Sequence, residues 1–164
     1  KVTATTSTKN IELVRSLGAD KVIDYTKENY LDEPSKFDVV YDTLGGKFTL
    51  DSFKILGSGG RVISIAGDLD SITAKQLGLN KIISFILALK ARKITKKASK
   101  MNALYRFLLM VPNGAQLKEL AMFYESGFIK PVIDKTYGFD SSIQALEYLS
   151  KGRAKGKVIV NLID

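Results

Sequence analysis

The sequence predicts an α/β fold with a doubly wound parallel sheet. Two short apolar runs support this prediction, residues 39–41 and residues 62–65; glycines end the first run and flank the second. Short apolar runs bounded by turn residues indicate strands that are buried on both faces. Residues 47–56 lie between the two runs and have the apolar pattern of a helix. A strand, a helix and a second strand in this order make a right-handed parallel crossover, so we expect the centre of the sheet here.

The rest of the chain continues this alternation of strands and helices. Further strands are expected over residues 1–6, 21–25, 104–111 and 157–160, and residues 129–139 look extended. Helices are expected after a cap at Ser7 or Thr8, over residues 81–97, and after capping boxes that begin at Asn113 and Ser141. Residues 26–36 are expected to form a loop with a short helix, and residues 68–80 to be irregular.

Length and composition restrict the class of protein. A chain of 164 residues can bury one sizeable core. It contains no cysteine and no histidine, which excludes disulfides, thiolate chemistry, the usual zinc sites and a serine–histidine triad within this sequence. It shows no secretory signal at Lys1 and no apolar run of the roughly 18 residues that a membrane span needs. We therefore expect a cytoplasmic protein without a membrane partner.

The charge balance is basic, with 25 lysines and arginines against 17 aspartates and glutamates and a formal net charge of +8. Such a balance favours anionic partners, among them phosphorylated cofactors, nucleic acids and acidic membranes. Residues 90–100 contain no acid and the following cations: Lys90, Arg92, Lys93, Lys96, Lys97 and Lys100. Two interpretations of this segment are open, the solvated face of a helix or a basic module that binds nucleic acid or an anionic surface.

The end of the first expected strand is a candidate anion site. Residues 5–10 read Thr-Thr-Ser-Thr-Lys-Asn and contain no acid. In dinucleotide-binding folds the second strand ends beside the adenosine ribose, where an acid holds the 2′-hydroxyl of NAD and a basic or hydroxyl-rich site accepts the extra phosphate of NADP. Here hydroxyls, an amide, the charge of Lys9 and a helix N-terminus could hold that phosphate. In the simpler alternative, Ser7 or Thr8 only caps the following helix.

At this point the order and spacing of several segments show a family resemblance. The segments are residues 2–7, 17–20, 22–25, 37–46, 60–67, 105–108 and 152–158. Together they resemble the medium-chain dehydrogenase/reductase superfamily, in particular its zinc-independent quinone oxidoreductase-like branch. The resemblance implies a Rossmann-type sheet truncated before its first strand and its Gly-rich loop. It also implies an NAD(P)-binding domain over residues 1–127 and a segment, residues 128–164, that returns into a GroES-like catalytic domain.

The resemblance implies a set of residues that contact NADPH. For the 2′-phosphate, Ser7 and Tyr25 match a hydroxyl and a strand-end tyrosine of the family, and Asn10 stands at the family's lysine position with Lys9 beside it. For Tyr25, packing at the sheet edge is the alternative. The remaining matches are Thr43, Leu44 and Gly45 for adenosine and ribose, Ala66 and Gly67 for the nicotinamide, Phe107 and Leu108 for the carboxamide, and Arg153 and Lys155 from the C-terminal segment. For the apolar residues only backbone contact is implied, and for Arg153 and Lys155 the favoured alternative is two solvated cations in a turn that ends a helix.

The implied activity is NADPH-dependent hydride transfer to a quinone or an α,β-unsaturated carbonyl, without a metal. In such a reaction the cofactor supplies the hydride and the protein fixes the geometry. No catalytic residue is identified, and Asp38, Asp42 and Asp51 receive no acid–base role. We expect the 164-residue chain to be inactive alone and to have no nucleic-acid partner. We also expect a homodimer through the sheet edge at residues 104–111, because apolar edges invite pairing.

Overall fold

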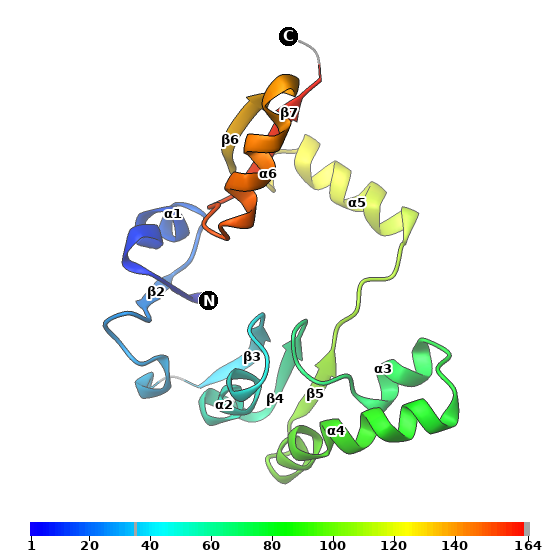
Figure 1. Cartoon of the computed structure of the whole chain (residues 1–164). Coiled ribbons are helices and arrows are strands. Elements are labelled where there is room, and N and C mark those ends of the chain that lie inside the picture. The colour runs from blue at the N-terminus through cyan, green and yellow to red at the C-terminus, as the bar shows by residue number, and fades with distance from the viewer. Residues whose placement is uncertain (35, 163–164) are drawn as a thin grey trace. The chain divides into compact units, whose positions relative to one another are not determined.

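The computed structural model describes residues 1–34 and 36–162 (Figure 1). Contacts divide the chain into two compact units, Lys1–Val111 and Pro112–Asp164, and each is described here by itself. The domain boundary expected after residue 127 stays a prediction. No helix of the described residues is long and apolar enough to cross a membrane.

The strands of the first unit are all parallel to their neighbours. Strand β1 (Thr3–Thr6) pairs with β2 (Lys21–Asp24) in a two-stranded sheet. A three-stranded sheet has the order β3 (Phe37–Asp42), β4 (Leu56–Ser64), β5 (Leu104–Phe107). Since parallel strands need crossover connections, helices alternate with strands along the chain. The predicted parallel α/β fold is therefore confirmed.

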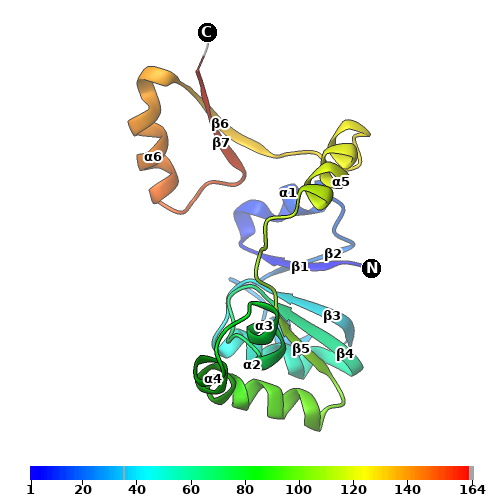
Figure 2. The ribbon, with the colours of Figure 1, turned by 90° about the vertical axis from the view of Figure 1, so that its right-hand side faces the viewer.

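Helices of the first unit follow the expected positions with one addition. They are η1 (Thr8–Asn10), α1 (Ile11–Ser16), η2 (Tyr30–Asp32), α2 (Lys47–Ile55), α3 (Ser71–Gln76) and α4 (Lys81–Lys100). Helices α2, α3 and α4 pack against the three-stranded sheet (Figure 2). The addition is α3, because residues 68–80 were expected to be irregular. That expectation is wrong because Asp70 accepts hydrogen bonds from the amides of Ile72 and Thr73 and so starts a short helix.

The hydrophobic core of this unit lies between the three-stranded sheet and the helices α2 and α4. Phe53 of α2 and Val62 of β4 are fully buried at its centre. Helix α4 contributes Ala91, Ile94 and Ala98, which are buried and lie three, then four, residues apart. This spacing places the three side chains on one helix face, which is why the predicted helix forms and extends to Lys100.

The central strand is more open than expected. Residues 39–41 were predicted to be buried on both faces, but Val39 is 55% and Tyr41 is 59% exposed, so that prediction is wrong. Among the described residues β3 pairs with β4 only, and its other edge borders a cleft of about 570 Å³. The cleft is lined on its opposite side by Val2, Thr3 and Ala4 at the start of the chain.

The cleft marks the place where the sheet is interrupted, and the strand order accounts for it. In the dinucleotide-binding strand order 3-2-1-4-5-6, the observed strands β2 and β1 correspond to strands 3 and 2, and β3, β4 and β5 to strands 4, 5 and 6. The cleft between β1 and β3 therefore lies where strand 1 stands in that order. The implied truncation before the first Rossmann strand agrees with this arrangement of the described strands.

Strand β5 is shorter than expected. The prediction covered residues 104–111, but the strand pairs with β4 only over Leu104–Phe107. The amide of Leu108 donates one further hydrogen bond of 2.8 Å to the carbonyl oxygen of Ser64, beyond which the chain leaves the sheet. Leu108, Leu109, Met110 and Val111 are consequently exposed.

The second unit has two parallel paired strands. One α-helix precedes the first strand along the chain, and another connects the two strands. Its elements are α5 (Gly114–Glu125), β6 (Ile133–Gly138), η3 (Phe139–Ser141), α6 (Ser142–Ser150) and β7 (Lys157–Asn161), with β6 and β7 paired. The predicted cap at Asn113 is confirmed, because its side chain accepts from the amides of Ala115 and Gln116. Ser141 stands at the N-cap of α6 as predicted, but its side chain makes no capping hydrogen bond, so the predicted capping box is wrong.

Candidate functional site

The carboxyl ends of β3, β4 and β5 lie in one row. The pairing register places Asp42 beside Ser64 and Ser64 beside Phe107. Ligands bind at this edge in open α/β sheets. Residues 43–45, 66–67 and 107–108, which the family resemblance implies as cofactor contacts, belong to this row or follow it within three residues. The structure thus brings these predicted segments to one edge of one sheet.

Asp42 is the centre of a buried hydrogen-bond network at this edge. Its Oδ1 accepts from the amides of Leu44 and Gly45 at 2.9 and 3.0 Å. Its Oδ2 accepts from the hydroxyls of Thr49 and Ser64 at 2.5 and 2.8 Å. Burial acts to raise the pKa of this carboxyl, but the hydrogen bonds outweigh it, so the pKa lies below the usual value for aspartate.

The two loops after β3 and β4 touch each other. Gly45 has φ +74°, a left-handed conformation that glycine adopts without cost. A Cβ on Gly45 would lie 2.1 Å from the carbonyl oxygen of Ala66. Glycine is therefore required at residue 45 both by its backbone angle and by the close approach of the neighbouring loop.

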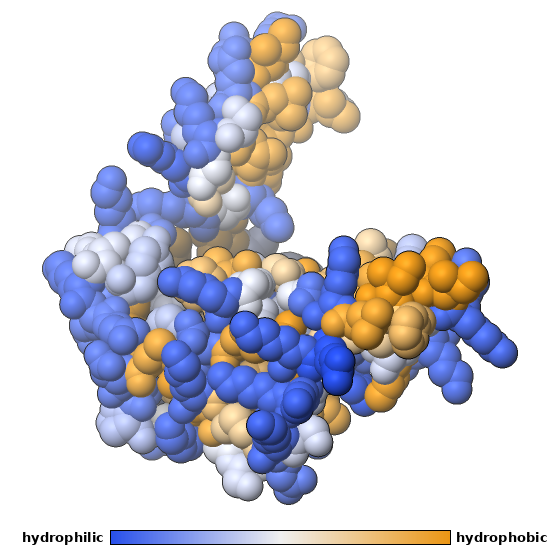
Figure 3. Space-filling model, turned by 60° about the horizontal axis from the view of Figure 1, so that its bottom comes forward, coloured by the Kyte–Doolittle hydropathy of each residue, from blue (hydrophilic) through white to orange (hydrophobic). Residues whose placement is uncertain are grey.

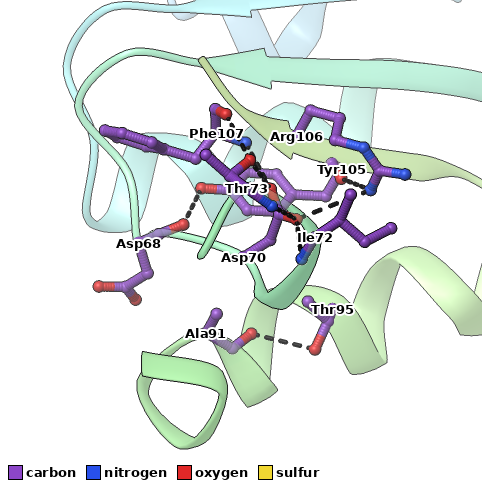
Figure 4. Close-up of polar contacts among 9 residues, drawn as sticks. All are labelled: Asp68, Asp70, Ile72, Thr73, Ala91, Thr95, Tyr105, Arg106 and Phe107. Carbon is purple, nitrogen blue, oxygen red and sulfur yellow. Dashed lines mark hydrogen bonds and ion pairs between the residues drawn. The ribbon is translucent and has the colours of Figure 1, made fainter. Parts of the chain in front are cut away.

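A second buried carboxylate holds the end of β5 (Figure 4). Asp70 is only 2% exposed; its Oδ2 accepts from the amide of Phe107 at 2.8 Å, and its Oδ1 caps α3. The hydroxyl of Thr73 lies 3.0 Å from Asp70 Oδ2 and 2.9 Å from the carbonyl oxygen of Phe107. Arg106 adds a weak ion pair, with Nη1 3.9 Å from Asp70 Oδ1. The position of Phe107 thus depends on α3, which the sequence did not predict.

These bonds determine which ligand groups this edge can take. The amides at the three strand ends already donate within the protein; they are those of Leu44, Gly45, Ala66, Gly67, Phe107 and Leu108. An anion site needs free donors, and these amides supply none. The edge instead offers exposed apolar side chains such as Leu44 and Leu108. It fits the uncharged parts of a ligand better than a phosphate.

The candidate anion site lies at the carboxyl ends of β1 and β2. Ser7 follows Thr6 and Tyr25 follows Asp24; Thr6 and Asp24 are register partners, and the amide of Tyr25 donates to the carbonyl oxygen of Thr6 at 3.0 Å. The two candidate phosphate ligands therefore leave the same edge of the sheet. Tyr25 is 60% exposed, which argues against the alternative that it packs at the sheet edge.

The hydroxyl-rich turn divides into used and available groups. The Ser7 side chain makes no capping bond, so the capping alternative is wrong for this residue. Thr8 is committed elsewhere, because its hydroxyl donates to Asp24 at 2.5 Å. Lys9 is exposed, and no residue of the described chain forms an ion pair with it. Within the same described part of the chain, the buried Oδ1 of Asn10 has no hydrogen-bond partner.

Hydrogen bonds keep Asp24 ionised beside this turn. Bonds from Thr26 and Thr8 lower the pKa of its carboxyl against the opposing effect of desolvation. Lys27 Nζ lies 3.9 Å from Asp24 Oδ2. The negative charge of Asp24 is thus partly balanced and its oxygens are occupied. It does not offer a ribose hydroxyl the free carboxylate that NAD-binding sites place at this strand end.

Arg153 and Lys155 lie in the second unit, on the turn between α6 and β7. The amide of Lys155 donates to Asp134 Oδ2 at 3.2 Å, and the hydroxyl of Tyr148 donates to the same oxygen at 2.7 Å. These bonds fix the backbone of the turn and involve neither of the two cationic side chains. Their contact with a cofactor stays a prediction.

The basic segment at residues 90–100 forms the second half of α4. Most of its cations are exposed, while Lys97 donates to the carbonyl oxygen of Leu50 at 2.7 Å and lies 5.8 Å from the ring centroid of Phe53. The first half of α4 exposes apolar side chains, namely Ile82, Phe85, Ile86 and Leu89. Figure 3 shows apolar side chains gathered in separate patches, with hydrophilic side chains over much of the rest of the face. The helix therefore has an apolar half and a basic half rather than one uniform basic face.

Comparisons with known proteins identify the family of this chain. A family model described as "Zinc-binding dehydrogenase" matches residues 17–160. The 2-methylene-furan-3-one reductase of Solanum lycopersicum is 39% identical over 99% of this chain and 34% of its own length. The NADPH-dependent alkenal/one oxidoreductase of Arabidopsis thaliana is 36% identical over 98% of the chain and 33% of its own length. The chain thus spans about a third of these relatives.

A solved structure shows the same fold. The quinone oxidoreductase of Coxiella burnetii superposes with a TM-score of 0.73 over 99% of this chain and 45% of its own, at 21% identity. Despite the family description, the residues present do not fit a zinc site. The chain has no histidine or cysteine, and its described residues bring together no group of three potential metal ligands.

Proposed function

The chain belongs to the medium-chain dehydrogenase/reductase superfamily, and on that premise we propose that it contributes the NADPH-binding residues of an oxidoreductase that reduces a quinone or an α,β-unsaturated carbonyl. One observation carries the cofactor assignment. Ser7, Lys9 and Tyr25 follow the paired ends of β1 and β2 within three residues and carry hydroxyl and ammonium donors that no hydrogen bond or ion pair of the described residues uses. Such donors suit the 2′-phosphate that distinguishes NADPH from NADH.

The two edges of the first unit match two parts of the dinucleotide. The β1–β2 end supplies donors for a phosphate. The ends of β3, β4 and β5 supply apolar side chains and loops whose amides are internally bonded. This second edge suits the adenine, the riboses and the nicotinamide ring.

The reaction follows from what the cofactor supplies and what the chain lacks. NADPH supplies the hydride, so the protein need only orient the donor and acceptor and exclude water. No metal is proposed, since the chain has no histidine or cysteine and its described residues gather no group of three potential metal ligands. The names of the tomato and Arabidopsis relatives describe reductases of conjugated carbonyl compounds, which supports the same substrate class here.

The proposal is tested by cofactor titration of the whole chain. We expect NADPH to bind at least tenfold more tightly than NADH, because a charged hydrogen bond contributes about 1.5–3 kcal/mol. Lys9→Ala should lower the affinity for NADPH about tenfold and leave the affinity for NADH unchanged. Lys27→Ala is the matched control: this lysine follows the same strand pair but faces Asp24, at 3.9 Å.

Two results would contradict the assignment. Equal affinities for NADPH and NADH would show that the chain has no site for the 2′-phosphate. Equal effects of Lys9→Ala and Lys27→Ala would show that the net charge of the chain, and not a specific contact of Lys9, favours NADPH. Salt-dependent binding to DNA or RNA that is tighter than binding to NADPH would favour the basic-module alternative, with α4 as its surface.

We also propose that the protein is a homodimer through the edge at residues 104–111. Strand β5 ends the sheet order, and the exposed apolar residues 108–111 follow it directly. Light scattering at micromolar concentration should report a dimer. Met110→Lys should shift the dimer towards monomer, because a charge on an apolar edge opposes pairing, and Met110 is 79% exposed. A monomeric unaltered chain would exclude this interface.

A further inference from the structure

A continuous chain of hydrogen bonds joins the loop after β3 to the loop after β4. The amides of Leu44 and Gly45 donate to Asp42 Oδ1, and the Ser64 hydroxyl donates to Asp42 Oδ2. The same Ser64 oxygen accepts from the amides of Ala66 and Gly67 at 3.2 and 2.8 Å. Asp42 and Ser64 thus form a pair in which each partner holds one loop and the bond between them joins the two.

The pair is protected from water and has no spare capacity. Ser64 is fully buried and Asp42 is 5% exposed. Every oxygen of the pair is occupied by bonds within the protein, so neither residue has a group left with which to bind a ligand directly. Both side chains therefore form hydrogen bonds with the loops rather than with a ligand. Removing one partner leaves buried donors unsatisfied, which is costly for the loop that depends on them.

Packing couples the loops a second time. Gly45 lies so close to Ala66 that a Cβ would meet the Ala66 carbonyl oxygen at 2.1 Å. A Cβ on Gly67 would lie 2.5 Å from the Tyr105 hydroxyl, 2.9 Å from Ser64 Oγ and 3.1 Å from Thr49 Oγ1. A displacement of either loop must therefore displace the other.

We propose that Asp42 and Ser64 are positioning residues that set these two loops as one rigid cradle for the uncharged part of the dinucleotide. This inference rests on the proposed function, because it assigns the cradle to NADPH. It differs from a general role in stability: the pair fixes where the backbones of Gly45 and Ala66 lie relative to each other, rather than only holding the sheet together.

Ser64→Ala and Thr49→Val separate these two roles. Ser64→Ala removes the link between the loops. Thr49→Val removes a hydroxyl bond to the same Asp42 oxygen, but Thr49 lies on α2 and its hydroxyl makes no hydrogen bond to either loop, although it packs near Gly67. Both residues are fully buried, so both variants lose one buried hydroxyl of similar environment. Asp42→Asn is a third variant: its amide oxygen can still accept from Leu44 and Gly45, but its amide nitrogen can accept from neither the Thr49 nor the Ser64 hydroxyl.

The first measurement is hydrogen exchange of individual amides in the whole chain. In Ser64→Ala, the amides of Ala66 and Gly67 should exchange at least tenfold faster, and those of Leu44 and Gly45, on the other loop, should also accelerate several-fold. In Thr49→Val, the Ala66 and Gly67 amides should keep their rates relative to the rest of the sheet. Acceleration of Ala66 and Gly67 alone would show that the loops are independent and would overturn the inference.

The second measurement is the affinity for NADPH at a temperature where each variant is fully folded. Ser64→Ala and Asp42→Asn should each weaken binding about tenfold, and the double variant should be no weaker than either, because both remove the same link. Thr49→Val should change the affinity less than twofold. Equal weakening by Thr49→Val would reduce the pair to a structural role. If the unaltered chain binds no NADPH, the proposed function fails, while the exchange rates still decide whether the loops move as one.

Discussion

Gly45→Ala is expected to lower the free energy of unfolding by about 2–4 kcal/mol and to abolish measurable NADPH binding. The added Cβ would lie 2.1 Å from the carbonyl oxygen of Ala66 and 2.8 Å from its carbon, so backbone rather than a flexible side chain must move. The residue must also hold φ +74°, which costs an L-residue about 1 kcal/mol or more. Urea denaturation and cofactor titration measure the two effects.

Gly46→Ala is the matched control for this change. Gly46 also has a positive φ, +56°, but a Cβ there would meet no atom within 4 Å. Because φ +56° with ψ −123° is a conformation that glycine strongly favours, we expect it to cost the conformational part alone, about 1–3 kcal/mol, and to leave the contact of Gly45 with Ala66 and the binding of NADPH intact. If the two alanine variants are equally destabilised, the contact between the loops after β3 and β4 is not a determinant of this fold.

Asp70→Ala is expected to destabilise the first unit by about 2–4 kcal/mol. The substitution removes the N-cap of α3 and leaves the amide of Phe107 without the acceptor that lies 2.8 Å away. Because both effects arise at the end of β5, exchange of the Phe107 amide should accelerate more than that of the β1–β2 amides. Uniform acceleration across the unit would argue against this local role.

The same carboxylate should make stability depend on pH. Burial acts to raise the pKa of Asp70, but bonds from Phe107 and Thr73 outweigh it and the net pKa lies below the usual value. The folded state therefore binds this proton less readily than the unfolded chain does. The stabilisation is fully present above the unfolded pKa of about 3.9 and is lost as the pH falls through the folded pKa. Asp42 acts in the same direction.

Asp70→Asn should therefore flatten the acid limb of the stability profile. We expect its urea midpoint to fall less between pH 6 and pH 3 than that of the unaltered chain, by roughly the contribution of one carboxyl group. Asp38→Asn, at an exposed residue, is the control and should follow the unaltered profile. An Asp70→Asn profile as steep as that of the unaltered chain would show that other groups dominate acid unfolding.

Local sequence patterns were sufficient for most elements. The helix at α4 was predictable because apolar residues recur at helical spacing, and the cap at Asn113 because its acceptor serves the next turn. The end of β5 was predicted too far along, because the apolar residues 108–111 resemble a strand although they have no partner strand. Apolarity indicates a tendency to be buried, whereas a strand exists only where a neighbour accepts its hydrogen bonds.

By itself, the sequence determined the parallel α/β class and which segments reach the edge where ligands bind, because short apolar runs, glycines and helical periods act over a few residues. Only the tertiary structure decided the roles of Asp42, Ser64 and Asp70. Asp42 and Ser64 are 22 residues apart, and Asp70 and Phe107 are 37 residues apart. Bonds between such residues depend on strand register and helix packing, which no local pattern specifies.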